Sequence, residues 1–118
     1  MNENCTVYRT MELLSKKWAV IIMLELYKMG GWNRFSEIKR SMRGITPKML
    51  SERLKDLESW GMVERKVDLE SVPIKVAYRL TEMGRDLFPT IRGIKQWAIR
   101  WGKGTPECMV QECSECIL

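Results

Sequence analysis

The segment from Thr46 to Gly61 constrains the fold more than any other part of this sequence. Thr46 followed by Pro47 predicts the start of a helix, because threonine caps a helix N-terminus and proline fits its first position. Three leucines then recur on one stripe of that helix: Leu50, Leu54 and Leu57. Such a stripe must pack against a core. We therefore predict a helix from about Pro47 to Trp60 that buries one face and ends at Gly61.

The opposite face of this predicted helix carries short or basic side chains. At 100° per residue it comprises Lys48, Ser51, Glu52 and Lys55. These residues are near the helix N-terminus, where free backbone N–H groups also favour phosphate. The helix thus combines a face for the core with a face suited to a polyanionic partner.

Three helices are expected before this one, in a chain of 118 residues that has room for one domain. The apolar face of the first, short helix is formed by Val7, Met11 and Leu14. The second helix runs from about Lys17 to Met29, and its apolar run from Trp18 to Leu24 suits the centre of the core. The third lies near residues 36–42, with Ile38 and Met42 facing inward.

Two strands are expected after the leucine helix, at about Met62 to Asp68 and Lys75 to Leu80, because both segments are rich in strand formers. Thr81 then caps a long C-terminal helix, which Pro89 kinks or divides. The fold class is therefore mainly α with a small β-hairpin. Two short helices joined by a tight turn, with a basic hairpin after the second, predict a winged helix-turn-helix.

The charge distribution agrees with that fold. The net charge is +5. Between Arg34 and Lys55 there are seven basic and two acidic residues, so this segment alone carries +5 and the rest of the chain is neutral overall. A concentrated basic stretch attracts polyanions, of which nucleic acid is the common one. A solvated helix face is the simpler alternative explanation of the same charges.

Candidate DNA contacts follow from how a winged helix-turn-helix binds, with its second helix in the major groove and its hairpin on the backbone or minor groove. The residues expected to contact the groove are Thr46, Lys48, Ser51, Glu52 and Lys55. The residues expected to meet phosphates are Arg34, Arg53, Arg65, Lys66 and Lys75. Arg53 lies at the edge of the buried stripe, so a structural ion pair with a nearby acid is an alternative for it.

Several motifs in order also carry a family resemblance. They are Cys5, Lys17-Trp18, RFSEI (34–38), GITPKMLSERLKDLE (44–58), GMVER (61–65) and the segment 73–84. This chain resembles the HxlR-type transcriptional regulators from about Cys5 to Gly102. The resemblance implies a dimeric repressor or activator of MarR-like architecture, joined through its first and last helices. It also implies an oxidant or electrophile sensor at the N-terminal cysteine, since some members of the family have one.

A homodimer is predicted from the residues as well, because the last helix has more apolar surface than so small a domain covers by itself. That surface comprises Leu87, Phe88, Ile91, Ile94, Trp97, Ala98 and Trp101. The alternative is that all of it packs on the chain's own core. A two-fold dimer would present two recognition helices about 34 Å, or a multiple of it, apart. Its partner would be double-stranded DNA with a near-palindromic operator.

The four cysteines leave three interpretations open. Cys5 precedes the first helix, and Cys108, Cys113 and Cys116 follow one another as C-x4-C-x2-C in a tail at residues 104–118, after a domain at residues 1–103. In the first they are redox-sensing thiols, whose disulfide would join Cys113 to Cys116 or Cys5 to a thiol of a second subunit. Cys5 is then the better sensor, because acidic neighbours disfavour a thiolate in the tail. Alternatively all four hold zinc or an iron–sulfur cluster, or the tail cysteines stay reduced and have no role. The first interpretation predicts no metal and no cofactor.

Other classes of protein are disfavoured. No apolar stretch approaches a membrane span, the N-terminus lacks the features of a signal peptide, and we expect a cytoplasmic protein. The chain has no histidine and no glycine-rich phosphate loop, so we do not expect an enzyme. A winged helix that binds a protein or RNA is the alternative function. A small-molecule ligand near Trp18, Met23 and Trp97 is a further possibility.

Overall fold

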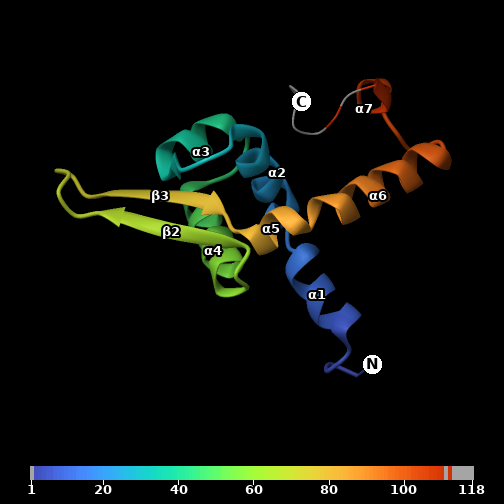
Figure 1. Cartoon of the computed structure of the whole chain (residues 1–118), viewed down its shortest axis with the longest axis horizontal. Helices are drawn as coiled ribbons and strands as arrows, with labels where there is room; N and C mark the ends of the chain where they lie inside the picture. The colour runs from blue at the N-terminus through green and yellow to red at the C-terminus, as the bar shows by residue number, and fades with distance from the viewer. Residues whose placement is uncertain (1, 111, 113–118) are drawn as a thin grey trace.

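The computed structural model describes residues 2–110 and 112, and its elements follow the predicted order (Figure 1). The helices are α1 (Thr6–Leu14), α2 (Ala19–Met29), α3 (Phe35–Ser41), α4 (Pro47–Ser59), α5 (Glu82–Asp86), α6 (Phe88–Arg100) and α7 (Pro106–Val110). The strands β1 (Asn33–Arg34), β2 (Val63–Asp68) and β3 (Lys75–Leu80) form an antiparallel sheet in the order β1-β3-β2. The prediction of a mainly α chain with a winged helix-turn-helix is confirmed.

The core lies between α2, α3, α4 and the base of the sheet. The leucine stripe of α4 is buried as predicted, since Leu50 and Leu57 are 0% exposed. Ile38 and Met42 also point inward, and they join Ile22 of the apolar helix α2 in the same cluster. Only the first residues of β2 and the last of β3 reach this core, so the rest of the β2–β3 hairpin extends beyond the helices as a wing (Figure 1).

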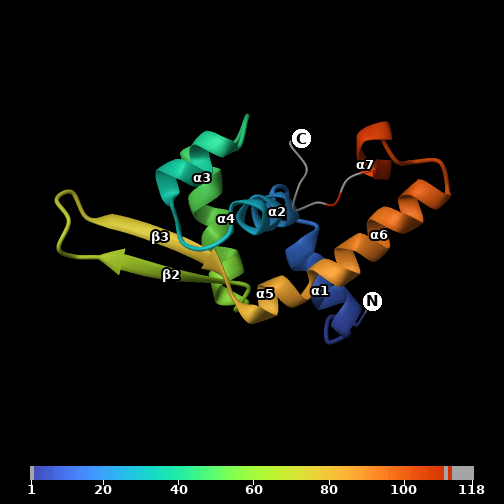
Figure 2. The same ribbon diagram turned by 45° about the horizontal axis from the view of Figure 1, so that its top comes forward.

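The wing and α6 extend from opposite sides of the helical body in both views (Figures 1 and 2). Helix α6 is separated from α5 at Leu87, immediately before Phe88 and Pro89, so the predicted division of the C-terminal helix is confirmed. At this joint the Phe88 ring stacks on Tyr27 of α2, with 4.0 Å between ring centroids. The joint therefore anchors α6 to the body at its first turn.

Three details differ from the sequence-based expectations. The sheet has a third strand, β1, whose two residues are too few to show an alternating pattern in the sequence. Helix α1 buries its predicted apolar face only in part: Val7 is 65% and Met11 48% exposed, Leu14 packs half-buried against the core, and the buried residue is Leu13. Trp18 lies outside α2 in a left-handed backbone conformation, with φ of 80°.

Candidate nucleic-acid interface

The solvent face of α4 carries the five predicted groove residues. All five are exposed: Thr46, Lys48, Ser51, Glu52 and Lys55. Thr46 has a structural task as well, because its Oγ1 accepts a hydrogen bond from the N–H of Met49 at 3.1 Å and caps the helix. The other four side chains enter into no contact among the described residues that would keep them from a partner.

Arg53 differs from the other predicted DNA contacts because its guanidinium is held within the protein. Its Nε donates to the carbonyl oxygen of Lys17 at 2.9 Å, and an Nη donates to Asp56 Oδ2 at 3.0 Å. Only 17% of its side chain is exposed. The structure thus contains the ion pair that the sequence left open as the alternative for this residue.

The register of the sheet sorts the basic residues of the wing onto two faces. Arg34 and Lys66 both pair with Ala77, so these three residues form one row across the sheet. Arg65 pairs with Tyr78 in the neighbouring row and therefore points to the other face, the one that reaches the core. Lys66 and Arg65 are adjacent in sequence, yet only Lys66 shares a surface with Arg34.

Three of the predicted phosphate contacts lie around one hollow of about 250 Å³ on the outer face of the sheet. Arg34, Lys66 and Lys75 line it together with Trp32, Glu37, Asp68 and Ala77. The structure therefore brings together residues from β1, β2 and β3 that are far apart in the sequence. Their positive charges are partly offset by the two carboxylates in the same lining.

Trp32 and Arg79 are residues of this surface that sequence reasoning missed. Lys66 Nζ lies 4.6 Å and the Arg79 guanidinium carbon 4.5 Å from the centroid of the Trp32 ring, and Arg79 also pairs with Glu64. Such cation–π contacts limit the freedom of a lysine head group. The signal in the sequence was the spacing of Trp32 and Arg34, which places both side chains on one face of an extended segment.

The loop of the wing is closed by Asp68. The Ser71 hydroxyl donates to Asp68 Oδ2 at 2.6 Å, and the Glu70 N–H donates to Oδ1 at 3.1 Å. These hydrogen bonds, that of Ser71 foremost, lower the pKa of Asp68 from its ordinary value. Asp68 therefore stays ionised at neutral pH, and it lies opposite Lys75 in the register of the sheet.

The described cysteines are free thiols. Cys5 occupies the N-cap position of α1 and Cys108 lies in α7, and both are half-buried. The start of α1 and α7 are well apart in both views, so the described residues bring Cys5 and Cys108 to no common site (Figures 1 and 2). Cys113 and Cys116 lie outside the described residues. Within the part of the chain that is described, no group of three metal-ligating side chains occurs.

The predicted ligand trio of Trp18, Met23 and Trp97 is not assembled. Met23 is fully buried in the core, whereas Trp97 on α6 is 57% exposed. Trp18 instead lines a hollow of about 670 Å³ with Ile21, Glu25, Arg40, Ser41, Met42 and Arg43. The described helices are all too short or too polar to cross a membrane.

The fold and this surface define a winged helix-turn-helix protein of the DNA-binding type: an exposed polar helix follows a tight turn, and a basic wing projects beside it. The model of the HxlR-like helix-turn-helix family matches residues 13–106. The chain therefore belongs to the HxlR-like helix-turn-helix family, and the predicted resemblance is confirmed.

Known relatives place the chain among regulators. The HTH-type transcriptional regulator YvaP of Bacillus subtilis is 38% identical over 93 residues, which are 79% of this chain and 83% of YvaP. The reduced form of the transcriptional regulator YodB from B. subtilis superposes with a TM-score of 0.71 at 40% identity, covering 82% of this chain and 93% of YodB. The redox regulator HypR in its oxidised form gives 0.63 at 38% identity, with 81% and 96% covered. The chain is thus a transcriptional regulator and not an enzyme, as predicted.

Proposed function

We propose that the chain binds a near-palindromic operator in double-stranded DNA as a homodimer, and that oxidation of Cys5 changes this binding. The observation that carries the proposal is the exposed polar face of α4 beside a basic wing. Lys48, Ser51, Glu52 and Lys55 would contact base edges from that face, with Thr46 at its start. Residues 1–103 would form the DNA-binding and dimerising unit, and 104–118 a tail.

The phosphate contacts would come from both faces of the sheet. Arg34, Lys66 and Lys75 share the hollow on the outer face of the sheet, and Arg65 lies on the face toward the helices. Such contacts fix the register of a protein on DNA, whereas base-edge contacts select the sequence. Because such a regulator acts on genomic DNA, the proposal places the protein in the cytoplasm.

Exposed apolar side chains support the homodimer. On α6 and just beyond it, Ile94, Trp97 and Trp101 are each more than half exposed, although their sizes favour burial. Val7 and Met11 on α1 are exposed as well. Apolar residues of the first and last helices would be covered by the same elements of a second copy, in an isologous interface.

DNA binding can be tested with the promoter of the protein's own gene as a labelled duplex, in fluorescence anisotropy over a range of salt concentrations. We expect tight binding. The logarithm of the association constant should fall linearly with the logarithm of the salt concentration, because phosphate contacts release counterions. A scrambled duplex is the control for sequence preference. Equal affinity for both duplexes would contradict sequence-specific binding and favour the protein-interaction alternative.

The thiol sensor is supported by the position of Cys5 and by the relatives. Cys5 is a free, half-buried thiol at the N-cap of α1, and free thiols are what oxidants attack. Among the similar solved structures, that of YodB is a reduced form and that of HypR is a redox regulator in its oxidised form. In this chain two thiols would lose two electrons and two protons to a thiol oxidant and form a disulfide between subunits, with Cys5 as one partner.

The sensor is tested by adding diamide to the same binding assay. The unmodified protein should change its affinity for the operator duplex, and dithiothreitol should reverse the change. Cys5→Ser should bind DNA normally and lose the response. Cys108→Ser is the matched control. A full response in Cys5→Ser would contradict the assignment and move the sensor to the tail.

A further inference from the structure

The recognition helix is tied to a distant part of the chain through one side chain. Arg53 reaches from the middle of α4 to the carbonyl oxygen of Lys17, in the turn between α1 and α2, at 2.9 Å. Its guanidinium also binds Asp56 Oδ2 at 3.0 Å, and the same oxygen accepts an ion pair from Lys16 Nζ at 3.3 Å. One carboxylate on α4 therefore holds two cations, one from its own helix and one from the turn.

The turn that accepts these contacts has an unusual backbone. Trp18 follows Lys17 directly and has φ of 80°, a conformation that bulky residues rarely adopt. Strained backbone persists only where its surroundings hold it in place. Here the bond from Arg53 fixes the preceding carbonyl, and the Trp18 ring extends toward Gly44, just before α4. The turn thus contacts the recognition helix at its middle and near its start.

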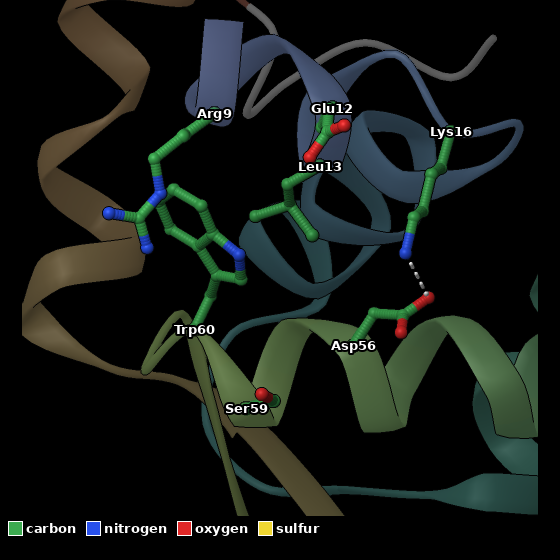
Figure 3. Close-up of a pocket in the computed structure, with 7 residues that line it drawn as sticks. All are labelled: Arg9, Glu12, Leu13, Lys16, Asp56, Ser59 and Trp60. Atoms are coloured by element: carbon green, nitrogen blue, oxygen red, sulfur yellow. Dashed lines mark ion pairs between the residues drawn. The ribbon is translucent and has the colours of Figure 1, made fainter. Parts of the chain in front are cut away.

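Helix α1 is otherwise separated from this side of α4 by a hollow of about 500 Å³ (Figure 3). Arg9 and Glu12 of α1 line it on one side, and Ser59 at the end of α4 and Trp60 just after it line it on the other. The dashed line in Figure 3 marks the ion pair of Lys16 and Asp56, which spans from the α1 side to α4. The ion pair at Asp56 therefore connects α4 with the end of α1 at this hollow, beside the buried side chain of Leu13.

We propose that Arg53 is a positioning residue, which together with Asp56 clamps α4 to the turn between α1 and α2 and so sets the angle at which α4 meets DNA. The inference rests on the proposed function, since α4 is taken as the recognition helix. Arg53 acts in this arrangement through the backbone of Lys17 and not through a phosphate. Arginine suits the task because its planar fork bonds two acceptors at once, which lysine does not.

The clamp and a phosphate contact predict opposite effects of Asp56→Asn. If Arg53 met a phosphate, removing the neighbouring carboxylate would free its charge and tighten DNA binding. If Arg53 is part of the clamp, the same change loosens the helix and weakens binding to the operator duplex by about tenfold. Glu58→Gln is the matched control, because Glu58 is an exposed acid on the same helix and its substitution changes the charge equally.

The experiment measures binding of the full chain to the operator duplex at several salt concentrations, for the two variants above and for Arg53→Lys and Arg53→Met. The clamp predicts that Asp56→Asn and Arg53→Lys both lose affinity while the salt slope stays unchanged, and that Glu58→Gln does not lose affinity. Tighter binding of Asp56→Asn, or wild-type affinity of Arg53→Lys, would overturn the proposal. A slope reduced by about 0.9 per lost phosphate contact in Arg53→Met would do so too.

A second measurement does not depend on DNA. The N–H of Ala19 donates to the Lys16 carbonyl at 3.1 Å and that of Ile22 to the Trp18 carbonyl at 2.8 Å. Hydrogen exchange at these amides should be several-fold faster in Asp56→Asn than in Glu58→Gln. Equal exchange rates in the two folded variants would contradict the clamp even if no duplex were bound. Failure of the wild-type protein to bind any duplex would count against the proposed function alone.

Discussion

Helices α4 and α6 have the same length of 13 residues and both are amphipathic, yet the chain uses them in opposite ways. The apolar stripe of α4 is fully buried, since Leu50, Leu54 and Leu57 are each at most 1% exposed. On α6 only Phe88 is buried, while Ile94 and Trp97 are more than half exposed. An apolar stripe in the sequence therefore indicates that a face will be covered, but not by which chain.

The difference between the two helices separates two tasks. Helix α4 is held by its own core, so its polar face is presented in a fixed orientation before any partner arrives. After its first turns, helix α6 keeps Ile94 and Trp97 largely exposed, and in the proposed dimer a second copy of the chain would bury them. Burial of apolar surface thus orders α4, the proposed recognition helix, within one copy and, in the proposed dimer, joins two copies.

The largest effect is expected from Leu54→Ala. Truncating a fully buried leucine should cost about 2–5 kcal/mol of the free energy of unfolding, because a cavity remains in the core. Chemical denaturation measures it, and Ile94→Ala on α6 is the matched control, for which we expect less than about 1 kcal/mol in the folded monomer. A similar loss of unfolding free energy in both variants at low protein concentration would contradict the difference in burial between α4 and α6.

A change of assembly is expected from Trp97→Glu. A charge in the exposed apolar stripe should weaken self-association by about 100-fold or more and leave the helical content unchanged. Sedimentation of the variant at several concentrations measures it. Gln96→Glu, one position away and outside the stripe, should dimerise normally. A fully dimeric Trp97→Glu protein would exclude this face of α6 from the interface.

The smallest of the three effects is expected from Lys48→Ala and Lys55→Ala on the solvent face of α4. Each should weaken operator binding by about tenfold and leave thermal stability unchanged, because neither side chain contributes to the core. Lys103→Ala removes the same charge beyond the end of α6 and serves as the control. Unchanged operator affinity in both α4 variants would remove this helix as the recognition helix.

Local patterns predicted the helices well because each one carries its own signal. The cap at Thr46, the leucine stripe and the glycine at 61 lie within one segment, and the structure reproduces all three. The inward side chains of Ile38 and Met42 were predicted from spacing alone, and both are buried. The division of the C-terminal helix near Pro89 needed only the stereochemistry of proline.

What the sequence did not predict depends on contacts between distant segments. The strand β1 exists only because Asn33 and Arg34 meet Ala77 and Tyr78. The Trp32 contacts with Lys66 and Arg79 likewise require the sheet to form first. For Arg53, periodicity placed the side chain at the edge of the stripe, but its acceptor is 36 residues earlier in the chain. The apolar face predicted for α1 packs on the core only at Leu14, while Val7 and Met11 are exposed in the part of the chain that is described.

The joint at Phe88 gives α6 the properties of a lever arm. The helix is fixed to the body at one end by the stacked rings of Tyr27 and Phe88, and its 13 residues span about 20 Å. A rotation of about 10° at the joint moves the far end by about 3 Å over that length. In the proposed dimer two such arms would be joined, and their angles would set the distance between the two α4 helices. Small torsional changes at one aromatic pair would thereby change the spacing at which the two α4 helices meet the half-sites of a rigid DNA duplex.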